Sequence, residues 1–312
     1  EHALLHATAV AVTGTATAAQ ASTIYSANPA ATFADISDTA AALALVNATA
    51  LDNATDVRAT DAATATEATT IYNGNSAATF AEISDTATAL VAVNAAALGN
   101  ADAVTVSGTA TAAQATTIYG ANPVVSFDTI SDTASALAAV DATALSLAAT
   151  VFATGTTSAT DAAALYAVDS SATFAAISGT ASALSDIASV LDQATLVTAS
   201  GTATVAQLTA IYGANNAATF AAVSGSASAL AGLLSTSGYE HALLHATAVA
   251  VTGTATAGQA VAIHTANATA SFAAIGGTAS ALLQVPSDVL NGAASVVVSG
   301  DYVDAASLHS LD

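Results

Sequence analysis

The sequence predicts an α/β repeat solenoid of about thirteen strand–helix coils, with a stacked parallel sheet on one face and short helices on the other. Three observations predict it. Aromatic residues recur in columns spaced mostly by 47 residues, each 47-residue unit splits into two similar halves, and each half carries a strand pattern followed by helix signals. Halves of 23 to 24 residues fall in the size range of leucine-rich-type coils, which stack strands on one face and helices on the other.

Two aromatic columns set the period. The first comprises Phe33, Phe80, Phe127, Phe174, Phe220 and Phe272. The second comprises Tyr25, Tyr72, Tyr119, Tyr166 and Tyr212, with His264 as its sixth member. We expect both columns to pack in the core, where Phe33, Ile36, Leu43 and their equivalents supply the bulk beneath alanine-rich helices.

The half-units follow from a motif that recurs inside each unit. The motif VTGTATAAQ at residues 12–20 is echoed by ISDTAAALA at residues 36–44, which divides 47 into 24 and 23. A Gly or Asp, nearly always after Ser or Thr, marks each coil. The thirteen marks are Gly14, Asp38, Asp61, Asp85, Gly108, Asp132, Gly155, Gly179, Gly201, Gly225, Gly253, Gly277 and Gly300.

Each coil begins with alternating apolar residues such as Val104 and Val106, the period of a half-buried strand. A capping box predicts the helix that follows, because a hydroxyl and a longer side chain satisfy the first free amides of a helix. The pairs are Thr17 with Gln20, Thr64 with Glu67, Thr111 with Gln114, Ser158 with Asp161 (an imperfect box), Thr204 with Gln207, and Thr256 with Gln259. Asparagine should end these helices in the left-handed conformation. The residues are Asn28, Asn75, Asn122, Asn215 and Asn267, with Asp169 in the sixth place.

We expect residues 1–312 to form one continuous solenoid, with an irregular insertion near residues 232–246 and an incomplete last coil at 295–312. Residues 240–257 repeat residues 1–18 without a change, which indicates a higher-order repeat of 239 residues. Uncapped solenoid ends expose strand edges. The chain is therefore expected to stack end to end on copies of itself, to pack laterally with them, or to continue as the same solenoid.

Composition excludes several classes of function. Arg58 is the only basic residue against 22 acidic ones, and a net charge of −21 argues against nucleic acid as a partner. No apolar run is long enough for direct membrane insertion. The absence of cysteine removes catalytic thiols and thiolate metal sites. Because no catalytic motif stands apart from the repeat, we expect a protein that is not an enzyme and that needs no certain cofactor.

Histidines in the irregular segment are one candidate metal site. His2 and His6 lie four residues apart, and their copies are His241 and His245, which follow Glu240. On a helix this spacing places both imidazoles on one face, as in a two-histidine metal site. The alternative is that they are exposed loop histidines.

Aspartates are the second candidate, as ligands for Ca²⁺. Asp38, Asp85 and Asp132 recur at one position of the repeat. They fall on alternate coils, about 9 to 10 Å apart, which is too far for two of them to share a calcium ion. The alternative is that each places negative charge at a helix N-terminus, where the helix dipole favours it.

Threonine follows the Gly or Asp mark in most coils. The residues are Thr15, Thr39, Thr86, Thr109, Thr133, Thr156, Thr180, Thr202, Thr254 and Thr278. A stacked hydroxyl ladder is one way to bind ice or carbohydrate. The alternative is that these hydroxyls close the strand-to-helix turns by local hydrogen bonds.

The segments VTVSGTATAAQATTIYGAN at residues 104–122 and SGTATVAQLTAIYGANNAATFAAVSGSASAL at 200–230 resemble the Ala/Thr-rich repeats of large secreted bacterial surface proteins. Such repeats occur in adhesin-like or S-layer-like proteins of cyanobacteria and other aquatic bacteria. The resemblance implies an extracellular location at the cell surface. Together with the expected stacking of the coils, this predicts a structural protein that forms a surface fibre, filament or layer. The alternative is an adhesin stalk or a binding module for carbohydrate, ice or a divalent cation that uses the Thr and Asp ladders.

Overall fold

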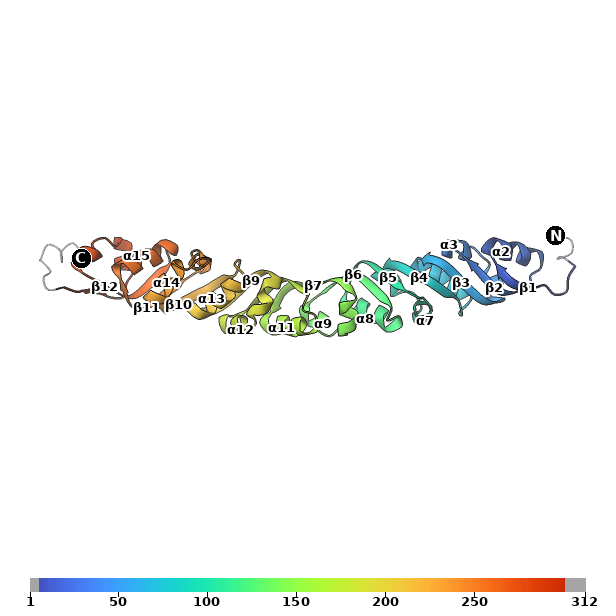
Figure 1. Cartoon of the computed structure of the whole chain (residues 1–312), viewed down its shortest axis with the longest axis horizontal. Helices are drawn as coiled ribbons and strands as arrows, with labels where there is room; N and C mark the ends of the chain where they lie inside the picture. Colours follow the sequence, from blue (N-terminus) through green and yellow to red (C-terminus); the bar gives the residue numbers. More distant parts are fainter. Residues whose placement is uncertain (1–5, 301–312) are drawn as a thin grey trace. The chain divides into compact units, whose positions relative to one another are not determined.

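The computed structural model describes residues 6–300. In these residues thirteen parallel strands, ordered as in the sequence, alternate with helices in an open α/β repeat solenoid (Figure 1). The predicted fold class is therefore confirmed. The chain divides into two compact units, unit 1 with Glu1–Ala153 and Val168–Ala172, and unit 2 with Thr154–Ala167 and Thr173–Asp312.

Unit 1 contains the elements from β1 to the first half of β7. They are β1 (Ala11–Ala16), α2 (Ala18–Ala27), β2 (Thr32–Asp38), α3 (Ala40–Leu43), α4 (Ala48–Asp52), β3 (Ala54–Ala63), α5 (Ala65–Gly74), β4 (Thr79–Thr86), α6 (Ala87–Leu90), α7 (Ala95–Gly99), β5 (Val104–Ala110), α8 (Ala112–Ala121), β6 (Val125–Asp132), α9 (Ala134–Leu137), α10 (Ala142–Ser146) and β7 (Ala148–Ser158).

Unit 2 takes up the chain in β7 and contains most of α11. Its elements are α11 (Ala159–Val168), β8 (Thr173–Thr180), α12 (Ala181–Asp186), η1 (Ala188–Gln193), β9 (Ala194–Thr204), α13 (Val205–Ala214), β10 (Thr219–Ser226), α14 (Ala227–Leu234), η2 (Ala242–His245), β11 (Val249–Thr256), α15 (Ala257–Ala266), β12 (Ala270–Gly277), α16 (Ala279–Leu282), α17 (Ser287–Asn291) and β13 (Val296–Val298).

Two kinds of coil alternate, which the sequence did not predict. In a first-kind coil an odd-numbered strand leads into one helix of ten residues, as β1 leads into α2. In a second-kind coil an even-numbered strand leads into shorter helical pieces, as β2 leads into α3 with four residues and α4 with five. The 47-residue unit is thus a pair of unlike coils.

The strands pair in parallel with their sequence neighbours. In unit 1, Val12 of β1 aligns with Phe33 of β2, and Phe33 aligns with Ala54 of β3. In unit 2, Val223 of β10 aligns with Val249 of β11. A register shift occurs in β1 between Val12 and Thr15, where the strand of the first-kind coil has one more residue than its partner strand. The same irregularity recurs in the later first-kind strands β3, β5, β9 and β11.

The phenylalanine column lies in the core, as predicted. Phe33, Ile36 and Leu43 are at most 2% exposed, and their equivalents along both units are buried as well. The tyrosine column behaves differently, since only Tyr212 is buried, with 8% exposure. Tyr25, Tyr72, Tyr119 and Tyr166 are half-buried. They lie at the margin of the core, where a phenol ring can pack while its hydroxyl stays near water.

The capping boxes are confirmed at Thr17, Thr64, Thr111, Thr204 and Thr256. The imperfect box differs as expected, because the Asp161 carboxylate accepts from the Ser158 hydroxyl, while the Ser158 hydroxyl accepts from the Asp161 amide.

The prediction for the asparagines was wrong in its mechanism. They do stand at the helix C-caps, but their backbone is extended, with φ −148° and ψ 110° at Asn75. No described residue other than glycine has a positive φ. Their side chains, rather than a left-handed turn, explain why asparagine recurs there, as the hydrogen bonds described below show.

Candidate functional site

The predicted histidine site is spread over several environments. His2 lies outside the described residues, and His6 is exposed. His241 is exposed at the start of η2, and Glu240 accepts a hydrogen bond from the Gly238 amide at 2.8 Å. The His245 ring packs edge-on against Tyr212, with centroids 5.3 Å apart. Between residues 6 and 300 no three His, Asp or Glu side chains come together as a metal site requires.

Tyrosine packing explains how the irregular insertion is held in unit 2. Tyr239 lies 5.9 Å from Tyr212, centroid to centroid, and its hydroxyl donates to the carbonyl of Thr209 at 3.3 Å. Tyr212 thus receives Tyr239 and His245 together, which accounts for its burial in a column whose other tyrosines are half-buried. Within this unit His245 serves the packing of the insertion.

The three predicted calcium aspartates each bind two backbone amides. Asp38 accepts from the amide of Thr39 at 2.8 Å through one oxygen and from the amide of Ala18 at 3.0 Å through the other. Ala18 is the first residue of α2, in the preceding coil. The carboxylate therefore caps a neighbouring helix, whose N-terminal amides have no partner inside the helix.

Asp85 and Asp132 repeat this geometry. Asp85 accepts from Thr86 at 2.7 Å and from Ala65 at 3.1 Å. Asp132 accepts from Thr133 at 2.8 Å and from Ala112 at 3.2 Å. We call this two-coil contact the aspartate clamp. The sequence reasoning anticipated the helix N-terminus but not that the helix belongs to the previous coil, and the calcium hypothesis stays a prediction.

Asp61 is a fourth clamp residue that the sequence reasoning did not single out. Its carboxylate accepts from the amide of Ala40, the first residue of α3, at 2.7 Å. It occupies the marked position of a first-kind coil, where glycine is usual. The sequence does contain a signal for it, because Asp61 replaces glycine at the marked position and lies 21 residues after Ala40, where α3 starts.

In unit 2 glycine stands at every marked position, so that the clamp carboxylate is absent there. A Cβ at Gly277 would meet Ala281, Leu282 and Ala257 at 3.6 to 3.7 Å, which is ordinary contact. A Cβ at Gly225 would lie 2.4 Å from Cγ2 of Val205. Val205 starts helix α13 where the equivalent helices start with alanine, so its side chain fills the place that a clamp would occupy.

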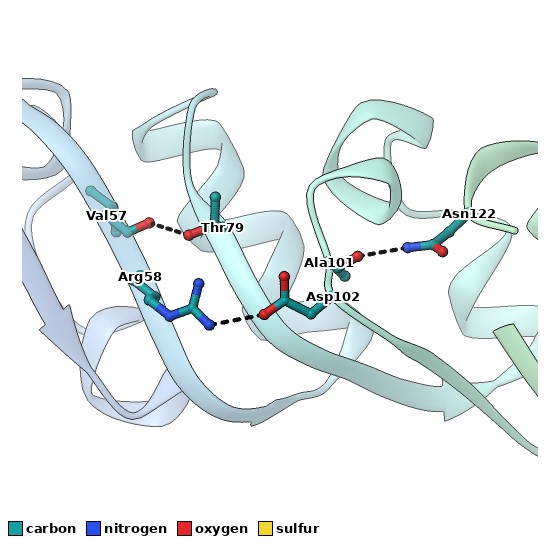
Figure 2. A network of polar contacts seen from close by, with 6 residues as sticks. All are labelled: Val57, Arg58, Thr79, Ala101, Asp102 and Asn122. Carbon is teal, nitrogen blue, oxygen red and sulfur yellow. Dashed lines mark hydrogen bonds and ion pairs between the residues drawn. The ribbon is translucent and has the colours of Figure 1, made fainter. Parts of the chain in front are cut away.

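The asparagines form a ladder in which one side-chain bond reaches the coil before and a second bond reaches the start of the asparagine's own coil. Asn75 Nδ2 donates to the carbonyls of Leu51 at 2.8 Å and Ala54 at 2.9 Å, while its Oδ1 accepts from the amide of Ala77. Asn122, Asn215 and Asn267 make the same two donor contacts. Asn75 and Asn122 are buried, with 7% and 3% exposure, and Asn215 is half-buried. Figure 2 shows Asn122 directed at the carbonyl of Ala101.

Asp169 interrupts the ladder. Its Oδ1 accepts from the amide and hydroxyl of Ser171 at 2.8 and 2.7 Å. Its Oδ2 is enclosed without a hydrogen-bond partner. A carboxylate has no N–H to donate, so it cannot make the bonds that asparagine makes to the carbonyls 21 and 24 residues earlier. At this position, which follows α11, the ladder therefore lacks its two donor bonds.

The predicted threonine ladder is divided between two roles. After the second-kind strands, Thr39, Thr86, Thr133, Thr180 and Thr278 are helix N-caps that accept from the amide three residues on. These hydroxyls close turns, as the alternative interpretation held. Thr15 instead donates to the Asp35 carboxylate of the next strand at 2.6 Å.

Other hydroxyls do align on neighbouring strands. In unit 1, Ser84, Thr105 and Ser126 are register partners, and Ser126 donates to Thr105 at 3.4 Å. In unit 2, Ser178, Thr198 and Thr219 form an equivalent row. Adjacent strands place such hydroxyls about 4.8 Å apart. These strand hydroxyl rows, which could not be identified without the strand register, are half-buried to exposed.

The single arginine pairs across the sheet surface of unit 1. Arg58 of β3 donates to Asp102 at 2.9 Å (Figure 2). Their side chains are 47% and 64% exposed, so the pair contributes little to stability. Figure 2 also shows the Thr79 hydroxyl of β4 directed at the carbonyl of Val57, a 3.4 Å contact with β3, the strand that carries Arg58.

One carboxylate has a resolved change in its acidity. Asp141 caps α10 by accepting from the amide of Thr143 at 2.8 Å. This amide, with a smaller contribution from the Thr143 hydroxyl, holds the pKa of Asp141 below its ordinary value of 3.8. The role of this carboxylate is a helix cap, which Asn47 and Asn94 perform in the equivalent coils.

Comparison with known protein families and with characterised protein sequences gives no match. Among solved structures, the leucine-rich repeat-containing protein LegL7 from Legionella pneumophila aligns with 96% of this chain and 97% of its own, with 10% sequence identity and a TM-score of 0.21. The fold assignment rests on the strand pairing described above rather than on this likeness. Among the described helices, none has the length and apolarity to cross a membrane.

Proposed function

We propose that this protein is a non-enzymatic structural component of an extracellular surface fibre or layer, built by association of its coils with further copies of the same chain. One observation carries the proposal: the repeated polar side chains bind the backbone of adjacent coils. The Asn75 bond to Leu51 and the aspartate clamp both join one coil to the coil before it. Side chains used in this way serve cohesion along the stack.

Composition supports an extracellular setting. The chain has no cysteine, one basic residue and a net charge of −21, and its repeats resemble those of secreted bacterial surface proteins. High negative charge keeps an extended surface soluble and limits non-specific association. The stack itself needs no charge pairing, because its interior is filled by the phenylalanine column and by alanine.

The purified full chain tests this proposal. Electron microscopy and sedimentation velocity over a range of concentrations should show fibres, layers or concentration-dependent oligomers. Single monodisperse particles at every concentration, with and without calcium, would contradict assembly. Addition of a chelator also tests the histidine and aspartate metal candidates, since dispersal by chelator would show that a divalent ion joins the copies.

The strand hydroxyl rows favour a second candidate, a binding module for ice or carbohydrate. Ser84, Thr105 and Ser126 offer donors and acceptors at a regular spacing on the sheet. We expect Thr105→Lys to abolish such binding without unfolding the chain, and Thr39→Lys, at a helix cap, to serve as the control for general damage. An unchanged ice-recrystallisation or glycan-array signal in Thr105→Lys would remove this candidate.

A further inference from the structure

The first described coil of unit 1 and the insertion coil of unit 2 share one sequence in two environments. Residues 1–18 and 240–257 are identical. In unit 2, Val249 and Val251 are 1% and 3% exposed. Their counterparts Val10 and Val12 are only half-buried. Since the residues are the same, the difference comes from what covers them.

In unit 2 the cover is a second-kind coil. Strand β10 pairs with β11, and the amide of Val223 donates to the carbonyl of Ala248 at 2.9 Å. The amide of Thr247 donates back to the carbonyl of Phe220 at 2.9 Å. Helix α14 packs beside α15. We call residues 219–239, which provide these contacts, the covering coil.

In unit 1 the matching surface has no such cover among the described residues. Strand β1 pairs with β2 on one edge. On the other side, Val12 and Ala16 of β1 and Ala19, Thr23 and Ile24 of α2 line a depression of about 450 Å³. Ile24 is half-buried, whereas its counterpart Ile263 is fully buried. We call this surface the β1 end face.

The alternation of coils defines what fits this face. In each described pairing within a unit, the strand that precedes a first-kind strand is a second-kind strand, as β2 precedes β3 and β10 precedes β11. The 239-residue repeat carries ten strands, β1 to β10. Because ten is an even number, a copy of residues 1–239 ends with a second-kind coil and the next copy begins with a first-kind coil. A further copy would therefore present its covering coil to this face.

We propose that the β1 end face is a docking surface for the covering coil, residues 219–239, of a second copy of the 239-residue repeat. This inference rests on the proposed association of repeats. The occupant is a repeat copy whose β10 edge is free, since within this chain β10 already pairs with β11. The docked junction reproduces the β10–β11 junction. The carbonyl of Ala9 accepts where Ala248 accepts, the amide of Thr8 donates where Thr247 donates, and Val12 becomes buried as Val251 is.

A tandem protein tests the proposal, with a copy of residues 1–239 placed ahead of the full chain. The sequence contains no cysteine, so a single introduced thiol reports its own burial through the rate of alkylation. In the full chain alone, Val12→Cys should react rapidly and Val251→Cys slowly. In the tandem, Val12→Cys in the inner copy should react at least about tenfold more slowly than in the full chain alone, approaching Val251→Cys. The pair Ile24→Cys and Ile263→Cys repeats the comparison if a valine variant fails to fold.

A matched control breaks the phase of the alternation. Its leading copy ends at residue 216, after nine strands, and brings the β9–α13 coil to the junction. The inner Val12→Cys should then react as rapidly as in the full chain alone. Equal alkylation rates in the ten-strand and nine-strand tandems would overturn the docking proposal. The proposed function would survive that result if microscopy showed assembly through other surfaces, and would fail separately if no assembly formed.

Discussion

The two units carry different residues at the marked Gly or Asp position of their coils. Unit 1 has aspartate at four of its six marked positions, and unit 2 has glycine at all seven. Asp38, Asp85 and Asp132 each bind amides of two coils, and Asp61 binds the amide of Ala40 in the coil before. Both units share the asparagine ladder. The ladder is thus the feature that both units share, and the clamp is an addition that one unit uses and the other omits.

The largest expected effect comes from breaking the shared ladder in a clamped region. Asn122→Asp would lose two N–H donors and place a carboxylate against the carbonyls of Leu98 and Ala101. We expect the free energy of unfolding to fall by about 3 kcal/mol or more, because buried acceptors lose their partners and a charge is desolvated. Urea denaturation followed by circular dichroism measures it. Asp169→Asn is the reverse change and should stabilise the protein by about 1 to 2 kcal/mol.

Removing one clamp should have a smaller effect. Asp85→Ala would leave the amides of Ala65 and Thr86 without their carboxylate acceptor. The loss should resemble that of a helix N-cap, about 1 to 2 kcal/mol in the free energy of unfolding. Asp102→Ala is the control, since it removes a charge from an exposed pair, and should cost less than about 1 kcal/mol. Equal losses for the two variants would mean that the clamp adds nothing beyond surface charge.

Transferring a clamp into unit 2 sharpens the comparison. Gly225→Asp alone should destabilise the protein by about 1 to 3 kcal/mol, because its Cβ collides with Val205. In the double variant Gly225→Asp with Val205→Ala, the collision is removed. The introduced carboxylate can then cap α13, so the lost stability should be regained. Thermal denaturation of the two single variants and the double variant measures the coupling. Additive effects would show that Val205 does not stand in the clamp's place.

The smallest effect concerns the pH dependence of one cap. The pKa of Asp141 is lower in the folded chain, so its contribution to stability is present above the ordinary value of 3.8 and is lost as pH falls through the folded pKa. Asp141→Asn keeps the cap without the charge, as at Asn47. The stability advantage of the native residue over this variant should therefore shrink from neutral pH to about pH 2. An advantage that stays constant with pH would contradict this cause.

The sequence predicted the fold well because its repeat signals are local. The strand alternation and the capping boxes each lie within a few residues, and the thirteen marks correspond to thirteen strands. The alternation of long and short helices was missed, although the halves differ in length by one residue. The helices of a second-kind coil are short because two N-caps, Thr39 and Asn47, each start a separate helix within a few residues.

The polar contacts between coils could not be predicted from local patterns. Asn75 binds carbonyls 21 and 24 residues earlier, and those partners are known only once the coils are stacked. Asparagine at a helix end was therefore interpreted as a left-handed stop. Likewise, the sequence alone leaves Asp38 as a candidate calcium ligand, because the amide of Ala18 is close to it only in the folded chain.

Amide hydrogen exchange, measured by NMR at the first residue of each long helix, tests the central claim most directly. If recurring polar side chains hold successive coils together, the amides of Ala18, Ala65 and Ala112, which bind clamp carboxylates, should exchange more slowly than those of Val205 and Ala257, where glycine replaces the clamp. Asp85→Ala should accelerate exchange at Ala65 selectively. Indistinguishable rates at the two sets of amides, or no change at Ala65 in that variant, would contradict the account.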